Sequence, residues 1–294
     1  YEIHWRDWSS DVCSSDLEFN ILLKFHDELP LVIMNYDQLE SPRNHPIIKE
    51  CRGLTLRTDN FDLVARSFYR FFDLEDQEAY KKFNFNNFMT QNKEDGSLVV
   101  LYYFDGSWRT NTRGSFGNEI VRNHKITWEA AIKKAFNTED LNTLDPYLDK
   151  TCSYVFEFCS PVNFNFRTYK EYKVYLLSVF KRYNELNWEE VKNLNLPFET
   201  VKNHKFNSLK ELKDFIYETS KQDPSFEGLV IRDDNNNRLK VKSDSYLGLV
   251  GLKNDLGDMK KGKINSYRPR NIFPFIKINS DLVLEHHPDV KEDY

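Results

Sequence analysis

A β-hairpin signal between two polar segments constrains the fold of this chain more than any other stretch. Residues 98–104 are apolar, with β-branched and aromatic side chains, and residues 107–112 follow them after the two-residue turn Asp105-Gly106. Because so short a turn makes the two strands antiparallel, the segments KEDG (93–96) and RGS (113–115) must lie at the same open end of the hairpin. The sequence therefore predicts a polar site at this end.

Strand signals outnumber helix signals along the rest of the chain. Further strands are predicted at 29–37, 53–57, 63–67, 152–160, 172–184, 226–232 and 238–244. Helices are predicted at 126–136, 141–148 and 208–221, and the last of these has Ser208 as a candidate N-cap with Glu211 three residues later. Because strands and helices do not alternate regularly, we expect an α+β fold of mostly antiparallel sheets flanked by helices.

The charge distribution favours a phosphate-bearing ligand at one face. The net charge of −5 argues against a protein that coats nucleic acid indiscriminately. Residues 238–270, however, contain nine Lys or Arg and three Asp, a local excess of six positive charges. For such a segment taken alone, an ordinary solvated surface is the alternative.

The sequence carries no signal for secretion or membrane insertion. It has no apolar run of about 18 residues and no basic segment followed by an apolar stretch at its start. Its four cysteines show no Cys-x-x-Cys spacing. We therefore expect a cytoplasmic protein.

Four charged elements are candidates for one site. KxDG (93–96) alone is a weak signal, for which a surface turn is the simpler interpretation. Glu157 lies inside an apolar strand, where a carboxylate needs a partner. Glu227 precedes a strand, and Lys240 and Lys242 alternate with apolar residues, so both ammonium groups project from one face. Taken alone, Glu157 could be an acid on an edge strand, Glu227 a cap or turn residue, and the two lysines protection of a sheet edge. The occurrence of all four elements in this order favours a site.

The order of these motifs is similar to that of a known superfamily. The segments are KEDGS (93–97), TRGS (112–115), YVFEF (154–158), EYKVYLLSVF (171–180), FEGLVI (226–231) and RLKVKSD (238–244). They resemble the six nucleotidyltransferase motifs of ATP-dependent polynucleotide ligases and RNA capping enzymes, and most of all those of the bacteriophage T4 RNA ligase 1 family. Upstream, ECRGL (50–54) and ARSFYRFFDLED (65–76) resemble segments of that family and favour RNA ligase over DNA ligase.

The resemblance implies an enzyme that joins RNA 5′-phosphate and 3′-hydroxyl ends. Lys93 would attack ATP to form a lysine–AMP phosphoramidate, because a P–N bond is labile again in the next step. A free lysine has a pKa of about 10.4, so a divalent metal ion, Mg²⁺ or Mn²⁺, and the cations Lys240 and Lys242 would lower that pKa. The resemblance thus implies ATP and a metal as cofactors, RNA as partner, and a role in phage-type RNA repair. We expect a monomer.

The resemblance also assigns roles to individual residues. Glu227 would hold or orient the metal, and Lys240 and Lys242 would grip the α-phosphate of ATP. Arg52 would contact the leaving phosphates, and Glu157 the ribose hydroxyl. The remaining positions are Asp95, which would support the site, Gly96, which allows close backbone approach, Arg113, which would lie near the nucleotide, and Leu177 and Val230, which would enclose the adenine unless they are plain core residues.

The sequence departs from the family pattern at two positions, and other classes of protein are alternatives to an RNA ligase. Arg113 and Arg70 stand where lysines are expected, which keeps the charge and changes the geometry. A DNA ligase or a capping guanylyltransferase is the nearest rival, but both normally continue into an OB-fold domain of short strands, which the segment after Tyr246 does not suggest. A non-catalytic nucleotide-binding module is the rival from another class, and the intact Lys93 and Glu227 speak against it.

We expect the chain to consist of three parts. Residues 7–17 (DWSSDVCSSDL) lack helix or strand periodicity and resemble a translated sequencing adapter, so residues 1–17 are expected to be non-native. Residues 18–250 would form the adenylation domain. Residues 251–294 would be the start of a truncated C-terminal region.

Overall fold

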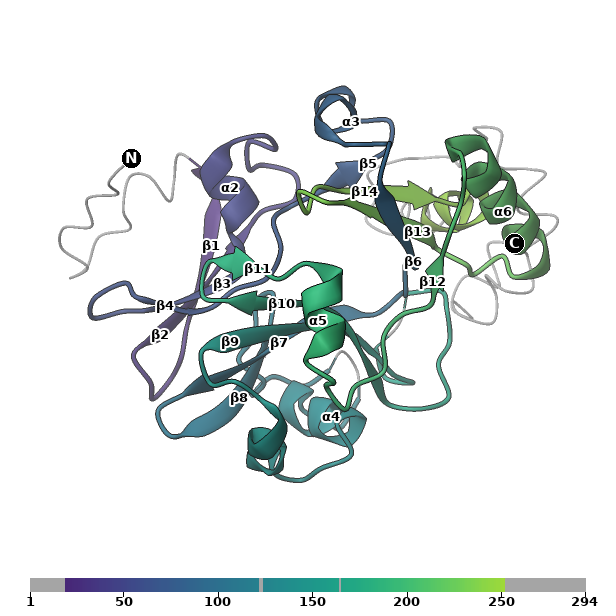
Figure 1. Cartoon of the computed structure of the whole chain (residues 1–294). Helices are drawn as coiled ribbons and strands as arrows, with labels where there is room; N and C mark the ends of the chain where they lie inside the picture. Colours follow the sequence, from purple (N-terminus) through teal and green to yellow (C-terminus); the bar gives the residue numbers. More distant parts are fainter. Residues whose placement is uncertain (1–18, 122–123, 164, 252–294) are drawn as a thin grey trace, which may run out of the picture. The chain divides into compact units, whose positions relative to one another are not determined.

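The computed structural model describes residues 19–121, 124–163 and 165–251 (Figure 1). The segments expected to be non-native (1–17) and C-terminal (251–294) lie outside these ranges, apart from residue 251. The chain divides into two compact units. Among the described residues, unit 1 comprises 19–71, 96–163 and 170–200. Unit 2 comprises 72–95, 165–169 and 201–251.

The first sheet of unit 1 is a four-stranded antiparallel meander. Its strands β1 (Ile21–Phe25), β2 (Leu31–Tyr36), β3 (Arg52–Arg57) and β4 (Leu63–Ala65) pair in sequence order. The short helix α2 (Pro46–Glu50) begins with proline, which lacks the N–H that the first turn leaves unpaired. The side chain of Ile48 in this helix is buried with Ile21, Met34 and Tyr36 of the sheet and with Cys51 at the end of the helix.

The second sheet of unit 1 contains the predicted hairpin. Its order is β11-β10-β9-β7-β8, all antiparallel, with β7 (Ser97–Phe104), β8 (Ser107–Thr112), β9 (Cys152–Cys159), β10 (Lys173–Lys181) and β11 (Asn184–Glu185). Asp105 and Gly106 both have positive φ, at 49° and 77°, as a tight hairpin turn requires. The hairpin prediction is confirmed, and β8 has the predicted bounds.

Both faces of this second sheet are buried. On one face its apolar side chains pack with α4 (Trp128–Ala135), the 3₁₀-helix η1 (Leu141–Tyr147) and α5 (Trp188–Asn193). On the other face Val100, Tyr102 and Val155 pack against Leu31 and Ala65 of the first sheet and against Phe68, which follows that sheet. The helix predicted at 141–148 is observed as the 3₁₀-helix η1, which is wound more tightly than an α-helix and contains Pro146.

Unit 2 is one five-stranded sheet with a helix on one face. The order is β12 (Asn203–His204), β6 (Phe88–Asn92), β13 (Gly228–Asp233), β14 (Arg238–Lys242) and β5 (Phe72–Asp73), and only the last of these pairs is parallel.

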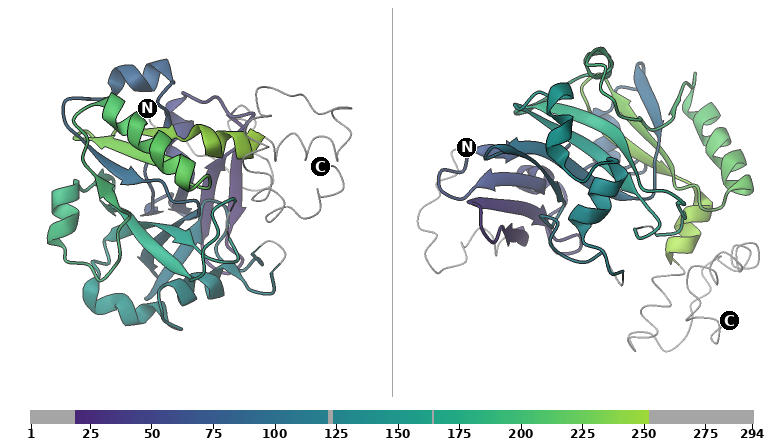
Figure 2. Two further views of the ribbon diagram at one scale, coloured as in Figure 1. Left: turned by 90° about the vertical axis from the view of Figure 1, so that its right-hand side faces the viewer. Right: turned by 90° about the horizontal axis from the view of Figure 1, so that it is seen from below.

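Helix α6 (Leu209–Gln222) lies along this sheet (Figure 2) and buries Leu212 and Ile216 against it. Ser208 is its N-cap, as predicted, and accepts from the Glu211 N–H. Unit 2 also contains α3 (Gln77–Lys82), and residues 244–251 are helical. The α+β class is confirmed.

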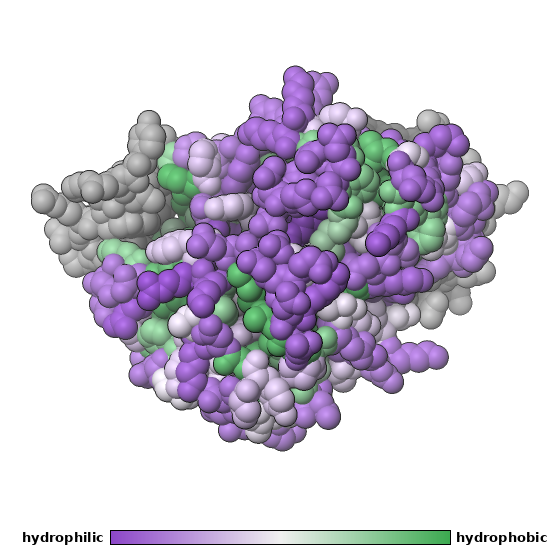
Figure 3. Space-filling model, in the orientation of Figure 1, coloured by the Kyte–Doolittle hydropathy of each residue, from purple (hydrophilic) through white to green (hydrophobic). Residues whose placement is uncertain are grey.

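Hydrophilic residues dominate the face of the molecule that Figure 3 shows. Within the described ranges, no helix combines the length and the apolar character needed to cross a bilayer.

Phe156 provides a test of the core of unit 1. It is fully buried in β9 and makes edge-to-face contacts with Phe136 and Phe198, with centroids at 5.1 and 5.0 Å. Phe156→Ala should lower the free energy of unfolding by about 3–5 kcal/mol, measured by urea denaturation, because it leaves a cavity. Tyr147→Ala, at a position that is 58% exposed, should change it by less than about 0.5 kcal/mol. Equal effects of the two substitutions would contradict this assignment of the core.

Candidate active site

The strand pair β6 and β13 places Lys93 beside Glu227. Lys93 directly follows β6, and its backbone N–H donates to the carbonyl of Gly228 at 2.9 Å. Gly228 has a φ of +132°, and a Cβ atom there would lie 2.2 Å from the carbonyl oxygen of Val241. Glycine is therefore required next to Glu227, because no side chain fits this close strand contact.

Glu227 is a buried carboxylate between two lysines. It is only 4% exposed. Lys93 Nζ lies 2.9 Å from its Oε2 atom, and Lys242 Nζ lies 3.3 Å from its Oε1 atom. The register of β13 and β14 pairs Gly228 with Lys242, which brings this lysine next to Glu227. Because a buried carboxylate is unfavourable without charged partners, the two ammonium groups stabilise it here.

Lys240 and Val230 lie on the same face of the sheet as Lys242. Val230 is opposite Lys240 in the register of β13 and β14. Val241, which lies between the two lysines, and Leu239, which precedes Lys240, are buried in the core on the α6 side of the sheet. Both lysines therefore share one face, as the alternation in the sequence predicted. Lys240 Nζ lies 3.7 Å from Asp73 Oδ1 on the neighbouring strand β5.

Asp95 ties the segment around Lys93 to two other parts of unit 2. Its side chain accepts hydrogen bonds from the Phe166 and Arg167 backbone N–H groups at 2.8 and 3.1 Å, from Asn165 Nδ2 at 2.8 Å and from the Tyr246 hydroxyl at 3.0 Å. Burial alone would raise the pKa of Asp95, but these hydrogen bonds outweigh it and lower the pKa below its ordinary value. Asp95 is therefore ionised at neutral pH and acts as an acceptor.

Two tyrosines of this network were not predicted from the sequence. Burial raises the pKa of Tyr246, so its hydroxyl stays protonated and donates to Asp95. The Tyr169 hydroxyl accepts from the Asp95 N–H at 2.9 Å and donates to Glu94 Oε2 at 3.0 Å. Neither tyrosine belongs to a periodic pattern, and both are distant from Asp95 in sequence, so no local signal pointed to them.

In unit 1, Glu157 is bonded to the backbone of Gly96. The Gly96 N–H donates to Glu157 Oε1 at 3.1 Å. A Cβ atom at Gly96 would lie 2.3 Å from the Phe158 carbonyl oxygen, so glycine is required at the start of β7. The carboxylate inside the apolar strand thus has the partner that its position demanded. Leu177 lies at an irregularity of β10, between the paired residues Leu176 and Ser178, and it packs partly against the core between the two sheets.

Three arginines of unit 1 surround Tyr36. Arg52 Nη1 donates to the Tyr36 hydroxyl at 3.2 Å. The guanidinium groups of Arg70 and Arg113 lie 4.2 and 4.9 Å from the centroid of the Tyr36 ring, and Arg113 Nη2 donates to Asn35 Oδ1 at 3.1 Å. Burial and the positive charge of Arg52 lower the pKa of Arg113. Arginine side chains concentrated in this way form a site for an anion such as phosphate.

The sequence pointed to the arginines of this cluster but not to its centre. Arg52 and Arg113 belong to the motifs, and Arg70 was noted as a departure. Tyr36 is the penultimate residue of the strand predicted at 29–37, at an alternate position, where an aromatic side chain is typical of core packing. Nothing in the sequence distinguished it from the apolar residues around it.

The predicted site residues thus fall into two sets. Those of unit 2 are Lys93, Asp95, Glu227, Val230, Lys240 and Lys242. Those of unit 1 are Arg52, Gly96, Arg113, Glu157 and Leu177. The contacts above connect residues within each set.

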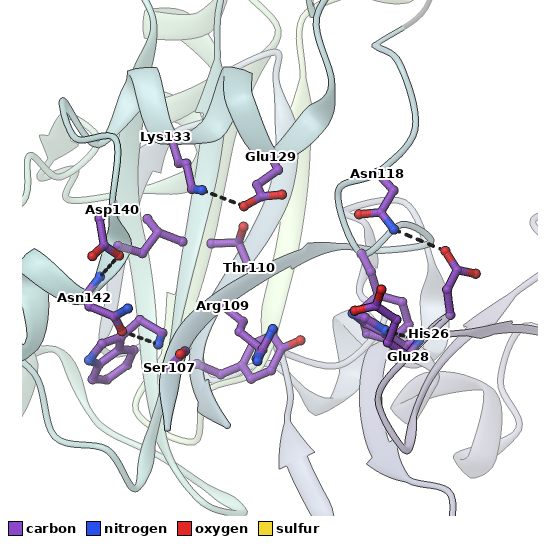
Figure 4. A pocket seen from close by; sticks show the side chains of 15 residues that line it. His26, Glu28, Ser107, Arg109, Thr110, Asn118, Glu129, Lys133, Asp140 and Asn142 are labelled. Carbon is purple, nitrogen blue, oxygen red and sulfur yellow. Dashed lines mark hydrogen bonds and ion pairs between the residues drawn. The ribbon is translucent and has the colours of Figure 1, made fainter. Parts of the chain in front are cut away.

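Unit 1 also contains a polar pocket that none of the predicted site residues lines (Figure 4). Its volume is about 410 Å³, and it lies among the turn at 26–28, β8, α4 and the start of η1. Several of its polar side chains satisfy one another, as Figure 4 shows: Lys133 pairs with Glu129 at 2.6 Å, and Asn118 bonds to Asp27 at 3.2 Å.

The fold is that of solved nucleic-acid ligases. The chain is similar to an archaeal ATP-dependent RNA ligase, with a TM-score of 0.60 and 12% identity over 94% of this chain and 76% of the other. It is also similar to a putative ATP-dependent DNA ligase from Aquifex aeolicus, with a TM-score of 0.55 and 15% identity over 95% of this chain and 73% of the other. At these identities the likeness establishes the fold alone.

The sequence comparison establishes the family. The RNA ligase family matches residues 50–246, and the chain belongs to it. A putative bifunctional polynucleotide kinase/RNA ligase of Autographa californica nuclear polyhedrosis virus is 31% identical over 248 residues, which cover 79% of this chain. The chain spans about a third of that relative, at 35% of its length.

The hydrogen bonds to Asp95 predict a pH-dependent contribution to stability. Because the folded-state pKa is lowered, the contribution is complete above the unfolded-state value of about 3.9 and is lost as the pH falls below it. Asp95→Asn should therefore lower the free energy of unfolding at pH 7 by about 1–3 kcal/mol. The difference from the wild type should shrink below about pH 4, measured by urea denaturation across pH.

The matched control is Asp214→Asn, at an exposed aspartate whose partner Lys210 is also exposed. It should change the free energy of unfolding by less than about 0.5 kcal/mol at either pH. A pH-independent loss for Asp95→Asn would contradict the role of its charge.

Proposed function

We propose that this chain catalyses ATP-dependent RNA ligation through lysine–AMP and RNA–adenylate intermediates. The observation that carries the proposal is the contact between Lys93 Nζ and the buried Glu227, with Lys242 on the other carboxylate oxygen, in a member of the RNA ligase family. A lysine placed against a buried acid and a second cation is a candidate nucleophile for phosphoryl chemistry.

In the first step, the nitrogen of Lys93 attacks the α-phosphorus of ATP. The P–N bond forms, the bond from the α-phosphorus to the bridging oxygen breaks, and pyrophosphate leaves. The ammonium group must first lose a proton, and Glu227 at 2.9 Å is placed to accept it. An RNA 5′-phosphate then displaces Lys93 from the AMP, and a 3′-hydroxyl finally displaces AMP to form the phosphodiester.

Glu227 also suits a divalent cation. Mg²⁺ prefers oxygen ligands and is usually held by one or two carboxylates together with substrate phosphates, so a large group of protein ligands is not needed. In the described ranges no cluster of three or more His, Cys, Asp or Glu side chains is arranged to hold a metal, which fits a site completed by ATP. Glu227 would hold Mg²⁺ or Mn²⁺, which would neutralise phosphate charge.

The remaining residues are assigned to parts of ATP. Lys240 and Lys242, on one face of β14, would bind the α-phosphate and stabilise the charge of the transition state. Arg52 and Arg113 would bind the leaving phosphates. Glu157 would bind the ribose hydroxyl, Leu177 and Val230 would contact the adenine, and Asp95 and Gly96 would hold the backbone around the nucleophile.

The wider proposal follows the family match. RNA with 5′-phosphate and 3′-hydroxyl ends would be the substrate, and repair of broken RNA in the cytoplasm would be the setting, with the protein acting as a monomer. Residues 18–250 would be the adenylation domain. The family match supports RNA over the DNA ligase and capping alternatives.

Lys93 provides the direct test of this proposal. Incubation with α-labelled ATP and Mg²⁺ should label the wild-type protein, and Lys93→Ala should abolish labelling because the nucleophile is lost. Lys210→Ala, at a lysine whose side chain is 87% exposed, should label normally. Stronger labelling by GTP would favour a capping enzyme, and wild-type labelling of Lys93→Ala would overturn the assignment.

Arg113 tests whether the arginine cluster binds phosphate through geometry or charge. Its side chain is held by Asn35 and the Tyr36 ring, so the planar guanidinium has a defined orientation. Arg113→Lys should therefore reduce kcat/KM of lysine–AMP formation by roughly 10-fold or more, the equivalent of one charged hydrogen bond. Arg57→Lys is the control, because Arg57 is paired with Asp59 and is not among the predicted site residues. An unchanged rate for Arg113→Lys would show that charge alone is used.

A further inference from the structure

A basic patch extends beyond the three arginines around Tyr36. We define the basic patch by Arg43, Lys49, Arg52, Arg66, Arg70 and Arg113, all in unit 1. The Arg70 N–H donates to the Lys49 carbonyl at 2.9 Å, and burial together with the nearby charges of Arg43 and Arg52 lowers the pKa of Arg70. Arg66 pairs with the carboxylate of Glu50, the residue after Lys49, at 2.9 Å. This concentration of positive charge contrasts with a chain whose net charge is −5.

Tyr69 is an exposed aromatic residue within this patch. It is 51% exposed, although the preceding Ser67 and Phe68 are only 4% and 5% exposed. Tyr69 is the residue immediately before Arg70, so its ring is carried by the same extended segment as the cations. An exposed ring is common on protein surfaces, but this ring belongs to the segment that carries Arg66 and Arg70, and it contacts the guanidinium group of Arg66.

The position of the Tyr69 ring is fixed by a buried cation. The Arg66 guanidinium lies 5.0 Å from the centroid of Tyr69 and 5.2 Å from that of Phe180. Arg66 itself is only 4% exposed and is held by Glu50. The ring is therefore supported by a rigid group while about half of the residue remains accessible. A pre-positioned aromatic ring loses little conformational entropy when a planar ligand stacks on it.

We infer that Tyr69 is a stacking platform for a base of the RNA substrate, with the exposed cations of the basic patch attracting the adjoining phosphates. Proteins that bind single-stranded nucleic acid combine cationic tracks with accessible aromatic rings in this way. The inference deepens the proposed function and rests on it for the identity of the strand as RNA. Tyr69 contributes to RNA binding and to the transfer of AMP to RNA, and not to lysine–AMP formation.

The test measures RNA affinity and lysine–AMP formation on the same variants. The probe is a short single-stranded RNA with a 5′-phosphate and a 3′ fluorophore, followed by anisotropy. Tyr69→Ala should weaken RNA binding by about 5- to 150-fold, the range for losing one base stack, and Tyr69→Phe should bind like the wild type. Labelling with α-labelled ATP should be unchanged in both variants.

Tyr217→Ala is the matched control. Tyr217 is 58% exposed and also lies against a paired cation, with Lys221 Nζ 4.0 Å from its ring centroid and Glu218 2.9 Å from that lysine, but it lies on α6, outside the basic patch. Its substitution should leave RNA affinity unchanged. Arg43→Gln should reduce the slope of log K against log salt by about 0.7, the value for one phosphate contact with a single strand.

Three outcomes would overturn the inference. One is RNA affinity of Tyr69→Ala equal to that of the wild type, and another is an equal loss in Tyr217→Ala. The third combines two results: Tyr69→Ala has a lowered melting temperature, and a stable Tyr69→Leu variant binds RNA like the wild type. Together these results would show that the ring only shields Arg66 from solvent. Absence of lysine–AMP in the wild-type protein would instead contradict the proposed function, and the RNA-binding measurements would still decide the role of Tyr69.

Discussion

The ion pair between Lys93 and the buried Glu227 is the interaction on which the geometry of unit 2 depends. The pairing of β6 with β13 places Lys93 beside Glu227. On its other side, β13 approaches β14 so closely at residue 228 that only glycine fits, and the register of these two strands brings Lys242 to the other carboxylate oxygen. With α6 covering the opposite face, the sheet can present charged side chains on one side and an apolar core on the other.

The predicted site cations of the two units differ in the groups that they contact. The three lysines of this set, all in unit 2, contact carboxylates: Glu227 for Lys93 and Lys242, and Asp73 for Lys240. Arg52 and Arg113 of unit 1 contact aromatic rings and uncharged oxygens. A lysine can exchange its proton with a neighbouring acid, whereas arginine keeps its charge at any working pH. Under the proposed function, the lysines of unit 2 would therefore suit proton transfer, and the arginines of unit 1 would suit phosphate binding.

The sequence predicted what local patterns determine. The hairpin around Asp105-Gly106, the long strands β9 and β10, and the Ser208 cap followed from turn chemistry and periodicity. The two-residue strands β5 and β12 could not be predicted, because their partners lie far away in sequence. The motifs identified the charged side chains of the site, while Tyr36, Tyr169 and Tyr246 emerged only from long-range contacts.

The two arginines that replace expected lysines have a physical explanation in Tyr36. The guanidinium groups of Arg70 and Arg113 both lie within 5 Å of the centroid of its ring, at 4.2 and 4.9 Å. A planar guanidinium contacts an aromatic face while its edge remains able to donate hydrogen bonds, which a lysine ammonium group does less well. Arg113 shows this combination, because it contacts the ring and donates to Asn35. Under the proposed function, arginine at these positions and tyrosine at residue 36 would form one phosphate-binding arrangement, so a change in one partner would alter what the others can do.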